Sequence, residues 1–180
     1  MKKAILAAAV STLFMVGAVH ADTNANDVSA SLSVTGSVTN EYACAVTLSD
    51  STVALDSDIA TLGVQGVNNP PNMKNIEISL SGDSQCSDLI AQQKVAYKFI
   101  GTVDSADGNV LANTVESDAG AKGVGVGLYD KDGQTIAVNH GTLLATQEST
   151  QLGLSLVKLN GQNVSSGGVQ SAVTIEIERL

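Results

Sequence analysis

The C-terminal end of the chain constrains its fold most strongly. Residues 172–178 alternate between apolar and polar side chains, which is the two-residue period of a β-strand that buries one face. Residues 28–35 show a similar alternation, in which Val28, Ala30, Leu32 and Val34 are separated by polar side chains. Two strand-like ends are two potential sheet edges with unpaired backbone groups, and such edges must be paired or protected. The pattern therefore indicates β-structure and would allow assembly by strand exchange.

The N-terminus has the order of a secretory signal. Lys2 and Lys3 precede an apolar run of sixteen residues, Ala4 to Val19, which closes with small residues around His20. A transmembrane anchor is the alternative, but the run is short for about 30 Å of hydrocarbon. We expect residues 1–21 to be a signal peptide that is cleaved between Ala21 and Asp22, so that the chain is exported.

The charge excludes two classes of partner. The formal net charge is −9, and removal of residues 1–21 with their two lysines leaves 159 residues at −11. Such a polyanion repels nucleic acid and anionic membrane, and no cluster of Lys or Arg offers a local exception. We expect no nucleic-acid partner, and we interpret the acidity as a solvated surface that keeps an exported protein soluble.

Cys44 and Cys86 are the only cysteines. An even number in an exported chain favours one disulfide over two free thiols. A disulfide that closes the loop of about forty residues between them would stabilise the fold by roughly 4 kcal/mol in the chain-entropy model. After cleavage only His140 remains as a histidine, so we expect no zinc site, and no motif predicts a cofactor.

The mature length suits one domain of the all-β class. Strand-like stretches recur at short spacing, with Asp-Gly turns and a Pro-Pro loop between them, and a short helical turn is expected near residues 87–93. This spacing is typical of a β-sandwich. The stretches are 30–38, 42–48, 52–55, 59–67, 75–81, 94–101, 109–114, 122–129, 134–138, 152–158 and 169–178.

No constellation of residues indicates catalysis. The glycines of 123–127 lack nucleotide-loop spacing and a following helix, so this segment is predicted as a strand with close backbone approach on its glycine face. Asp130 to Gly133 begins like a calcium loop but lacks the later ligands, which favours a turn. His140 lies in an Asn-His-Gly turn, and no nucleophile elbow is present. We therefore expect a protein that is not an enzyme.

Several segments resemble the subunits of chaperone/usher fimbriae, the type 1 pilin family of Gram-negative bacteria. Val34–Val38 lead into Cys44, and Ile76–Leu80 lead into Cys86, as in that family. The most specific similarity is the order and spacing of three further segments. These are Tyr97–Thr102, Asn109–Ala112 and Gly123–Asp130.

The resemblance implies an incomplete immunoglobulin-like β-sandwich with a hydrophobic groove beside the C-terminal strand. A periplasmic pilus chaperone would fill the groove first, and at the outer-membrane usher the N-terminal extension of a neighbouring fimbrial subunit would replace it as a donor strand. Arg179 stands where the family usually has an aromatic residue. The groove and chaperone-contact residues implied by the family pattern are Gly167, Val169, Val173, Ile175, Ile177 and Leu180.

The same resemblance divides the mature chain into a donor-strand extension, residues 22–31, and a pilin domain, residues 32–180. If Val28 sets the phase, the donor residues that face the groove are Asn24, Asn26, Val28 and Ala30. They are small or polar, whereas a fully buried large aliphatic side chain contributes about 1.5 to 3 kcal/mol. The alternative is that residues 22–28 are a loose terminus.

The expected function is that of a structural subunit of an adhesive fimbria on the bacterial surface, polymerised by donor-strand exchange. A minor adapter or terminator subunit of the same fibre stays open. A self-sufficient secreted β-sandwich that binds carbohydrate or protein is a second class. A small exported hydrolase is a third, and it has no residues in its favour.

Overall fold

The computed structural model describes residues 44–180. The predicted signal peptide, the cleavage site at Ala21 and Asp22, and the strand predicted at 30–38 lie outside the described residues. The predicted donor residues Asn24, Asn26, Val28 and Ala30 lie outside them as well.

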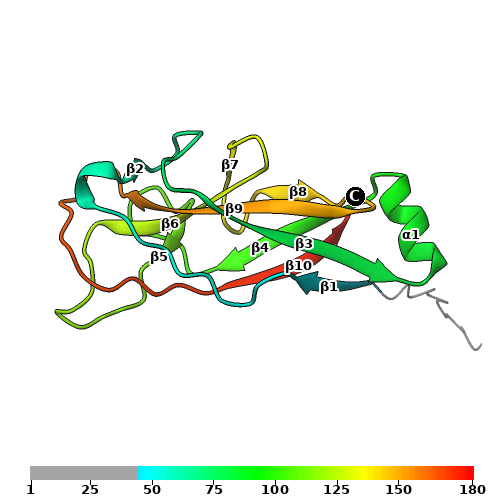
Figure 1. Ribbon diagram of the computed structural model, residues 1–180, viewed down its shortest axis with the longest axis horizontal. Coiled ribbons are helices and arrows are strands. Elements are labelled where there is room, and N and C mark those ends of the chain that lie inside the picture. The colour runs from blue at the N-terminus through cyan, green and yellow to red at the C-terminus, as the bar shows by residue number, and fades with distance from the viewer. Residues whose placement is uncertain (1–43) are drawn as a thin grey trace, which may run out of the picture. The chain divides into compact units, whose positions relative to one another are not determined.

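The regular secondary structure of the described chain is almost entirely β-strand (Figure 1). Its elements in chain order are β1 (Cys44–Leu48), the 3₁₀ helix η1 (Ile59–Thr61), β2 (Gly63–Val64), β3 (Lys74–Gly82), α1 (Ser84–Ala91), β4 (Val95–Gly101), β5 (Leu111–Ala112), β6 (Val124–Tyr129), β7 (Thr135–Ile136), β8 (Thr142–Leu144), β9 (Ser149–Lys158) and β10 (Val173–Arg179).

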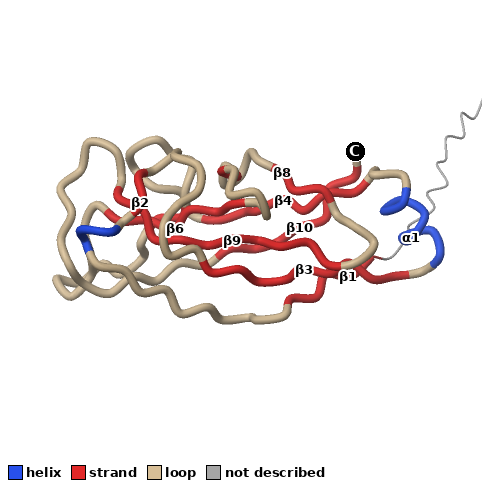
Figure 2. Tube along the Cα trace, turned by 45° about the horizontal axis from the view of Figure 1, so that its top comes forward, coloured by secondary structure: helices blue, strands red, loops and turns tan. Residues whose placement is uncertain are grey.

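Two sheets make up the fold, and Figure 2 shows their strands running along the same long direction. The larger sheet has the order β1-β3-β9-β6-β5, with β2 added to β9 and β7 added to β6. The smaller sheet has the order β10-β4-β8. All pairings are antiparallel except that of β2 with β9. The predicted all-β, immunoglobulin-like sandwich is confirmed.

The core lies between the two sheets. Alternate residues of β3, β6 and β9 from the larger sheet pack against Val95, Tyr97 and Phe99 of β4, each of which is fully buried. Val173, Ile175 and Ile177 of β10 pack against the same cluster but are only half-buried. Because successive side chains of a strand point to opposite faces, this inward set explains the alternation seen in the sequence of β10.

A second, smaller cluster lies on the other face of the larger sheet. It joins Tyr129 to Val110, Val157 and Leu159. A Cβ added to Gly127 would meet the Tyr129 hydroxyl at 2.6 Å, and one added to Gly125 would meet the Leu111 carbonyl at 2.8 Å. The predicted close backbone approach on the glycine face of this strand is confirmed at Gly125, whereas Gly127 leaves room for the Tyr129 ring.

The predicted disulfide joins Cys44, the first residue of β1, to Cys86 in α1. Their Cα atoms are 5.6 Å apart. The Asp83 carboxylate caps α1 by accepting a hydrogen bond from the Cys86 amide at 2.9 Å, as the N-cap position favours. The disulfide therefore links β1, an edge strand, to α1, the helix that connects the two sheets.

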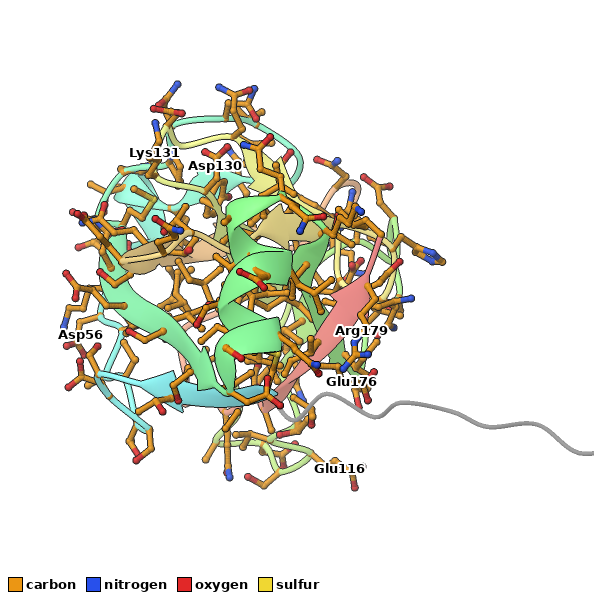
Figure 3. The ribbon with its side chains drawn as sticks, turned by 90° about the vertical axis from the view of Figure 1, so that its right-hand side faces the viewer. Asp56, Glu116, Asp130, Lys131, Glu176 and Arg179 are labelled. Atoms are coloured by element: carbon orange, nitrogen blue, oxygen red, sulfur yellow. A yellow bond between two sulfur atoms is a disulfide. The ribbon has the colours of Figure 1, made fainter. Side chains whose placement is uncertain are left out.

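The turn at Asp130 is also confirmed. One oxygen of the Asp130 carboxylate accepts hydrogen bonds from the backbone amides of Asp132 at 2.9 Å and Gln134 at 2.8 Å. Gly133 has a φ of +74°, a conformation that favours glycine. Figure 3 shows Asp130 and Lys131 at one edge of the molecule, with Glu116 at the opposite edge.

One strand prediction is wrong, and two others are wrong in part. Residues 52–55 form no strand, because the pairing of β1 with β3 ends at Leu48 opposite Ile78. Residues 59–67 form η1, capped by Asp58, and then only the two residues of β2. Residues 169–172 precede β10 as irregular chain, because Gln170 bonds to Thr114 instead of to a strand.

Two further elements differ from expectation. The strand β8 was not predicted, since three residues, Thr142–Leu144, are too few to show a period. The helix α1 begins at Ser84, before the expected turn, because its cap is Asp83.

Candidate functional site

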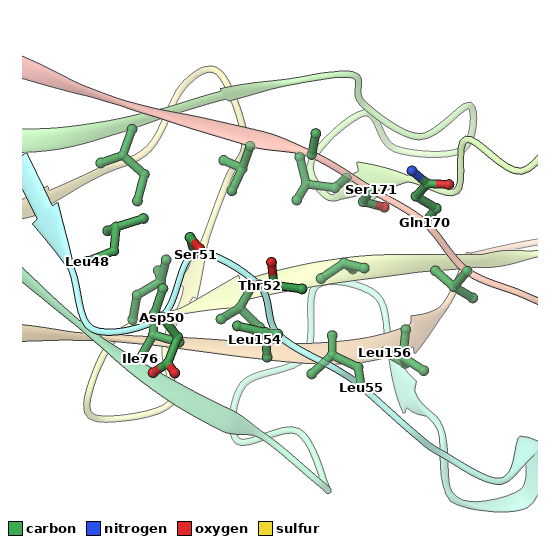
Figure 4. A pocket seen from close by; sticks show the side chains of 18 residues that line it. Leu48, Asp50, Ser51, Thr52, Leu55, Ile76, Leu154, Leu156, Gln170 and Ser171 are labelled. Carbon is green, nitrogen blue, oxygen red and sulfur yellow. The ribbon is translucent and has the colours of Figure 1, made fainter.

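An open groove runs along the sandwich beside β10. Its first lip is formed by residues 48–55, and its second lip is formed by residues 169–175. The groove has a volume of about 450 Å³. Figure 4 shows Asp50, Ser51 and Thr52 on the first lip and Gln170 and Ser171 on the second.

The floor of the groove is the hydrophobic core itself. Large aliphatic side chains of β3, β5, β6 and β9 line it from below, and all of them belong to the core cluster or pack against it. These floor residues are Ile76, Leu111, Val126, Leu152, Leu154 and Leu156. Five of these residues are at most 8% exposed and Leu156 is half-buried, so the lips already cover most of the floor.

A smaller chamber continues the groove toward η1. It has a volume of about 310 Å³ and shares Leu156 and Val169 with the larger one. Ile59, which lines this chamber, is 47% exposed, a large fraction for an isoleucine. Shared walls make the two chambers one continuous groove along residues 167–175.

The strand β10 has one paired edge and one open edge. It pairs with β4 along its full length, from Val173 opposite Gly101 to Arg179 opposite Val95. Within residues 44–180, no strand pairs with its other edge. An edge of this kind presents unsatisfied N–H and C=O groups that can pair with another strand.

The structure brings together four of the six predicted groove residues. Val173 and Ile175 line the larger chamber, Gly167 lines the smaller one, and Val169 lines both. The other two predicted residues lie elsewhere: Ile177 packs against the core without lining the groove, and Leu180 is 61% exposed at the chain end. The Leu180 amide donates to the Lys94 carbonyl at 2.9 Å, which fixes the end of β10 beside the start of β4.

Gly167 allows a close approach between two backbone segments. A Cβ on Gly167 would meet the Gly120 carbonyl carbon at 2.5 Å and the Ala119 oxygen at 2.6 Å. A Cβ on the next residue, Gly168, would meet nothing closer than 3.7 Å. The smaller chamber therefore keeps its shape only if position 167 has no side chain.

Sequence reasoning did not identify the first lip or the floor. The alternation of Val53 and Leu55 is a weak signal for the lip, and both residues pack against the core. In the sequence, the floor residues have the same pattern as other core residues, because a sequence does not show which core residues will line a groove. The open side of the sandwich is a property of the tertiary arrangement.

The groove carries little polar chemistry. Asp50 and Asp58 are its charged lining residues, and in residues 44–180 no Lys or Arg lines either chamber. No group of three or more His, Cys, Asp or Glu side chains within the described part could hold a metal ion. His140 is exposed and lies outside the lining of both chambers. The arrangement suits an extended, mainly apolar chain segment.

Comparison with known proteins gives one family and one similar solved structure. A search of curated proteins finds no match. A solved Burkholderia pseudomallei antigen and type I fimbria protein is similar over 75% of this chain and 94% of its own, with 16% sequence identity and a TM-score of 0.37. None of the helices in residues 44–180 has the length and apolar character to span a membrane. The sequence model of fimbrial proteins matches residues 32–178, and because that match spans most of the sequence, the chain belongs to the fimbrial protein family.

Proposed function

We propose that this fimbrial subunit is completed by a strand from a neighbouring subunit, which enters the groove beside β10. Membership of the family implies association with other fimbrial subunits. The observation that supports the finer proposal is the free edge of β10: it borders an apolar groove, and its half-buried Val173 and Ile175 line that groove.

A strand in the groove would answer two physical needs at once. Its backbone would pair with the open edge of β10, as in other cases of β-augmentation. Its alternate side chains would pack against the half-buried Val173 and Ile175, and a large aliphatic side chain that becomes fully buried contributes about 1.5 to 3 kcal/mol. A β-strand fits better than a compact ligand because the groove is long and follows residues 167–175.

The donor in this proposal is the N-terminal extension, residues 22–31, of another subunit, with Asn24, Asn26, Val28 and Ala30 toward the groove. The same phase continues into Leu32 and Val34 at the start of the proposed pilin domain, residues 32–180. The contact joins one end of a subunit to a different surface of the next, so it is unsymmetrical and extends into a filament.

Assembly in this proposal follows the chaperone/usher pathway. The signal peptide, residues 1–21, directs export to the periplasm, where a chaperone strand occupies the groove before the usher exchanges it for the donor. The exposed position of Leu180 leaves its terminal carboxylate accessible to basic chaperone residues. Arg179 in place of the usual aromatic residue changes one contact and leaves the apolar face of β10 intact. The product is an adhesive fimbria at the cell surface.

Cross-linking between two variants tests the proposal. One subunit carries Val28→Cys and the other carries Val173→Cys, a position that lines the groove. Mixed under oxidising conditions, the two should form a covalent heterodimer, because a donor strand beside β10 brings such residues within the ~4.4 to 6.8 Å Cα separation of a disulfide. Non-reducing electrophoresis measures the yield.

The matched control replaces Thr174 instead of Val173. Thr174 is the next residue of β10 and is exposed on the opposite face of its sheet. The yield with Thr174→Cys should be at background. Equal yields at positions 173 and 174, or no product with either, would contradict the proposal.

A further inference from the structure

The groove is bordered by negative charge. Asp50 lines the larger chamber, Asp58 lines the smaller one, and Asp56 lies on the same segment between two lining residues. All three side chains are exposed. Near the second lip, Glu116 and Asp118 belong to the loop whose Ala119 and Gly120 contact Gly167.

The nearest cations only partly offset these carboxylates. Lys74 donates a hydrogen bond from Nζ to the Ala54 carbonyl at 2.5 Å, so its ammonium group lies at the first lip. Lys98 pairs with Glu178 at 3.4 Å on the outer face of the smaller sheet. Lys122, beside Ser165, and Lys158, which lies opposite Val124 in the sheet, are the cations close to the smaller chamber. The lining itself carries two negative charges and no positive one.

The N-terminal segment of a sister subunit is acidic too. Residues 22–43 contain Asp22, Asp27 and Glu41 and no Lys or Arg. With Val28 directed into the groove, alternation directs Asp27 outward to the mouth. The lining at that mouth already carries Asp50 and Asp58, so like charges meet there.

We propose that the border of the groove selects a cationic occupant: an extended segment of another polypeptide that carries Lys or Arg beside its alternating apolar residues, in preference to the acidic N-terminus of a sister copy. The inference rests on the proposed function and adds the kind of partner. Charge around a cleft acts mainly on the association rate, which it changes by about 10- to 1,000-fold in favourable cases. The border therefore favours a fibre neighbour of different sequence.

The test compares two synthetic peptides on the mature chain, residues 22–180. One has the sequence of residues 22–38, and the other carries Asp22→Lys and Asp27→Lys. The mature chain is immobilised sparsely so that its copies cannot meet, and a biosensor records association rates. At low salt the lysine peptide should associate about tenfold faster. At about 1 M salt, where the Debye length is about 3 Å, the two rates should converge.

A charge-removing variant locates the effect at the groove. In Asp50→Asn with Asp58→Asn, the low-salt ratio of the two rates should fall to less than half its original value. The asparagine at position 58 can still cap η1, so the fold is kept. The control, Asp132→Asn with Glu148→Gln, removes the same charge from two exposed turns outside the groove lining and should leave the ratio unchanged.

Two failures are distinguishable. Two results would overturn the selection by charge: equal association rates for both peptides at low salt, or a ratio of the two rates that stays the same in the Asp50→Asn, Asp58→Asn variant. In either case the groove would remain a strand acceptor. Failure of both peptides to bind at any salt concentration would overturn this inference together with the proposed function.

Discussion

Two regions of the sandwich differ in whether their hydrogen-bonding groups find partners within the described chain. A polar corner, made of Gln65, Asp104, Asn109 and Asn160, closes one part of the molecule with hydrogen bonds from the chain itself. Gln65 is 2% exposed, and it donates to Asn109 Oδ1 at 2.8 Å and accepts from the Asn160 amide at 3.0 Å. The Asp104 carboxylate accepts from four backbone amides, those of Ala106, Asp107, Asn109 and Val110, at 2.8 to 3.1 Å.

The groove shows the opposite condition. Its floor and walls are apolar, its β10 residues are half-buried, and no strand of the described chain pairs with the free edge of β10. The polar corner is therefore paired within one chain, whereas no strand within residues 44–180 pairs with the free edge of β10. The difference shows that two regions of the same sandwich are closed to different degrees.

The largest expected effect is the loss of unfolding free energy on truncating a core side chain, compared with the loss on truncating a side chain of the groove. Ile78→Ala, at a residue that is 0% exposed, should lower the free energy of unfolding by about 3 kcal/mol, since it leaves a cavity. Ile175→Ala on the groove wall should cost about 1 kcal/mol, because a half-buried side chain loses less. Urea denaturation of the mature chain measures both.

Occupancy of the groove sharpens the same comparison. With a saturating peptide of residues 22–38, the cost of Ile175→Ala should rise toward that of Ile78→Ala, because the peptide would bury Ile175 as well. Equal costs in the free chain would mean that the groove is already covered.

The second effect tests the polar corner through pH. Burial raises the pKa of the Asp104 carboxyl, but hydrogen bonds led by the Val110 amide outweigh it and hold the pKa below the ordinary value. The carboxylate therefore stabilises the fold above the unfolded pKa of about 3.9, and this contribution is lost as the pH falls through the folded pKa. Asp104→Asn should cost about 2 kcal/mol at pH 7.

The pH profile gives this prediction its control. The stability difference between the natural chain and Asp104→Asn should shrink as the pH is lowered from 7 to 3 in chemical denaturation. Asp132→Asn, on an exposed turn, should stay within about 0.5 kcal/mol throughout. A difference at position 104 that does not change with pH would show that the carboxylate charge does not matter there.

The last comparison concerns two adjacent glycines at the end of the groove. Gly167→Ala should cost about 2 to 3 kcal/mol, because the new methyl group would overlap the backbone of Ala119, Gly120 and Ala121. Gly168→Ala, with nothing closer than 3.7 Å, should be close to neutral. Thermal unfolding measures both, and the comparison fails if the two substitutions have the same effect.

The sequence by itself determined the elements whose pattern is local. Alternation predicted β10, and short apolar stretches between turn residues predicted β3, β4 and β6. The count of cysteines predicted the bond between Cys44 and Cys86. The resemblance to fimbrial subunits predicted a groove at Val169, Val173 and Ile175, and these residues line the larger chamber.

Only the tertiary structure decided what lies opposite these residues. The first lip, residues 48–55, has no regular structure of its own, and its place beside β10 depends on where β1 leaves β3. Burial of Gln65 and Asp104 likewise depends on partners far away in sequence, such as Asn160. The period of apolar residues along a strand shows which side chains share a face. Whether that face is covered depends on contacts between segments that are distant in the sequence, and such contacts form only when the sheets pack together.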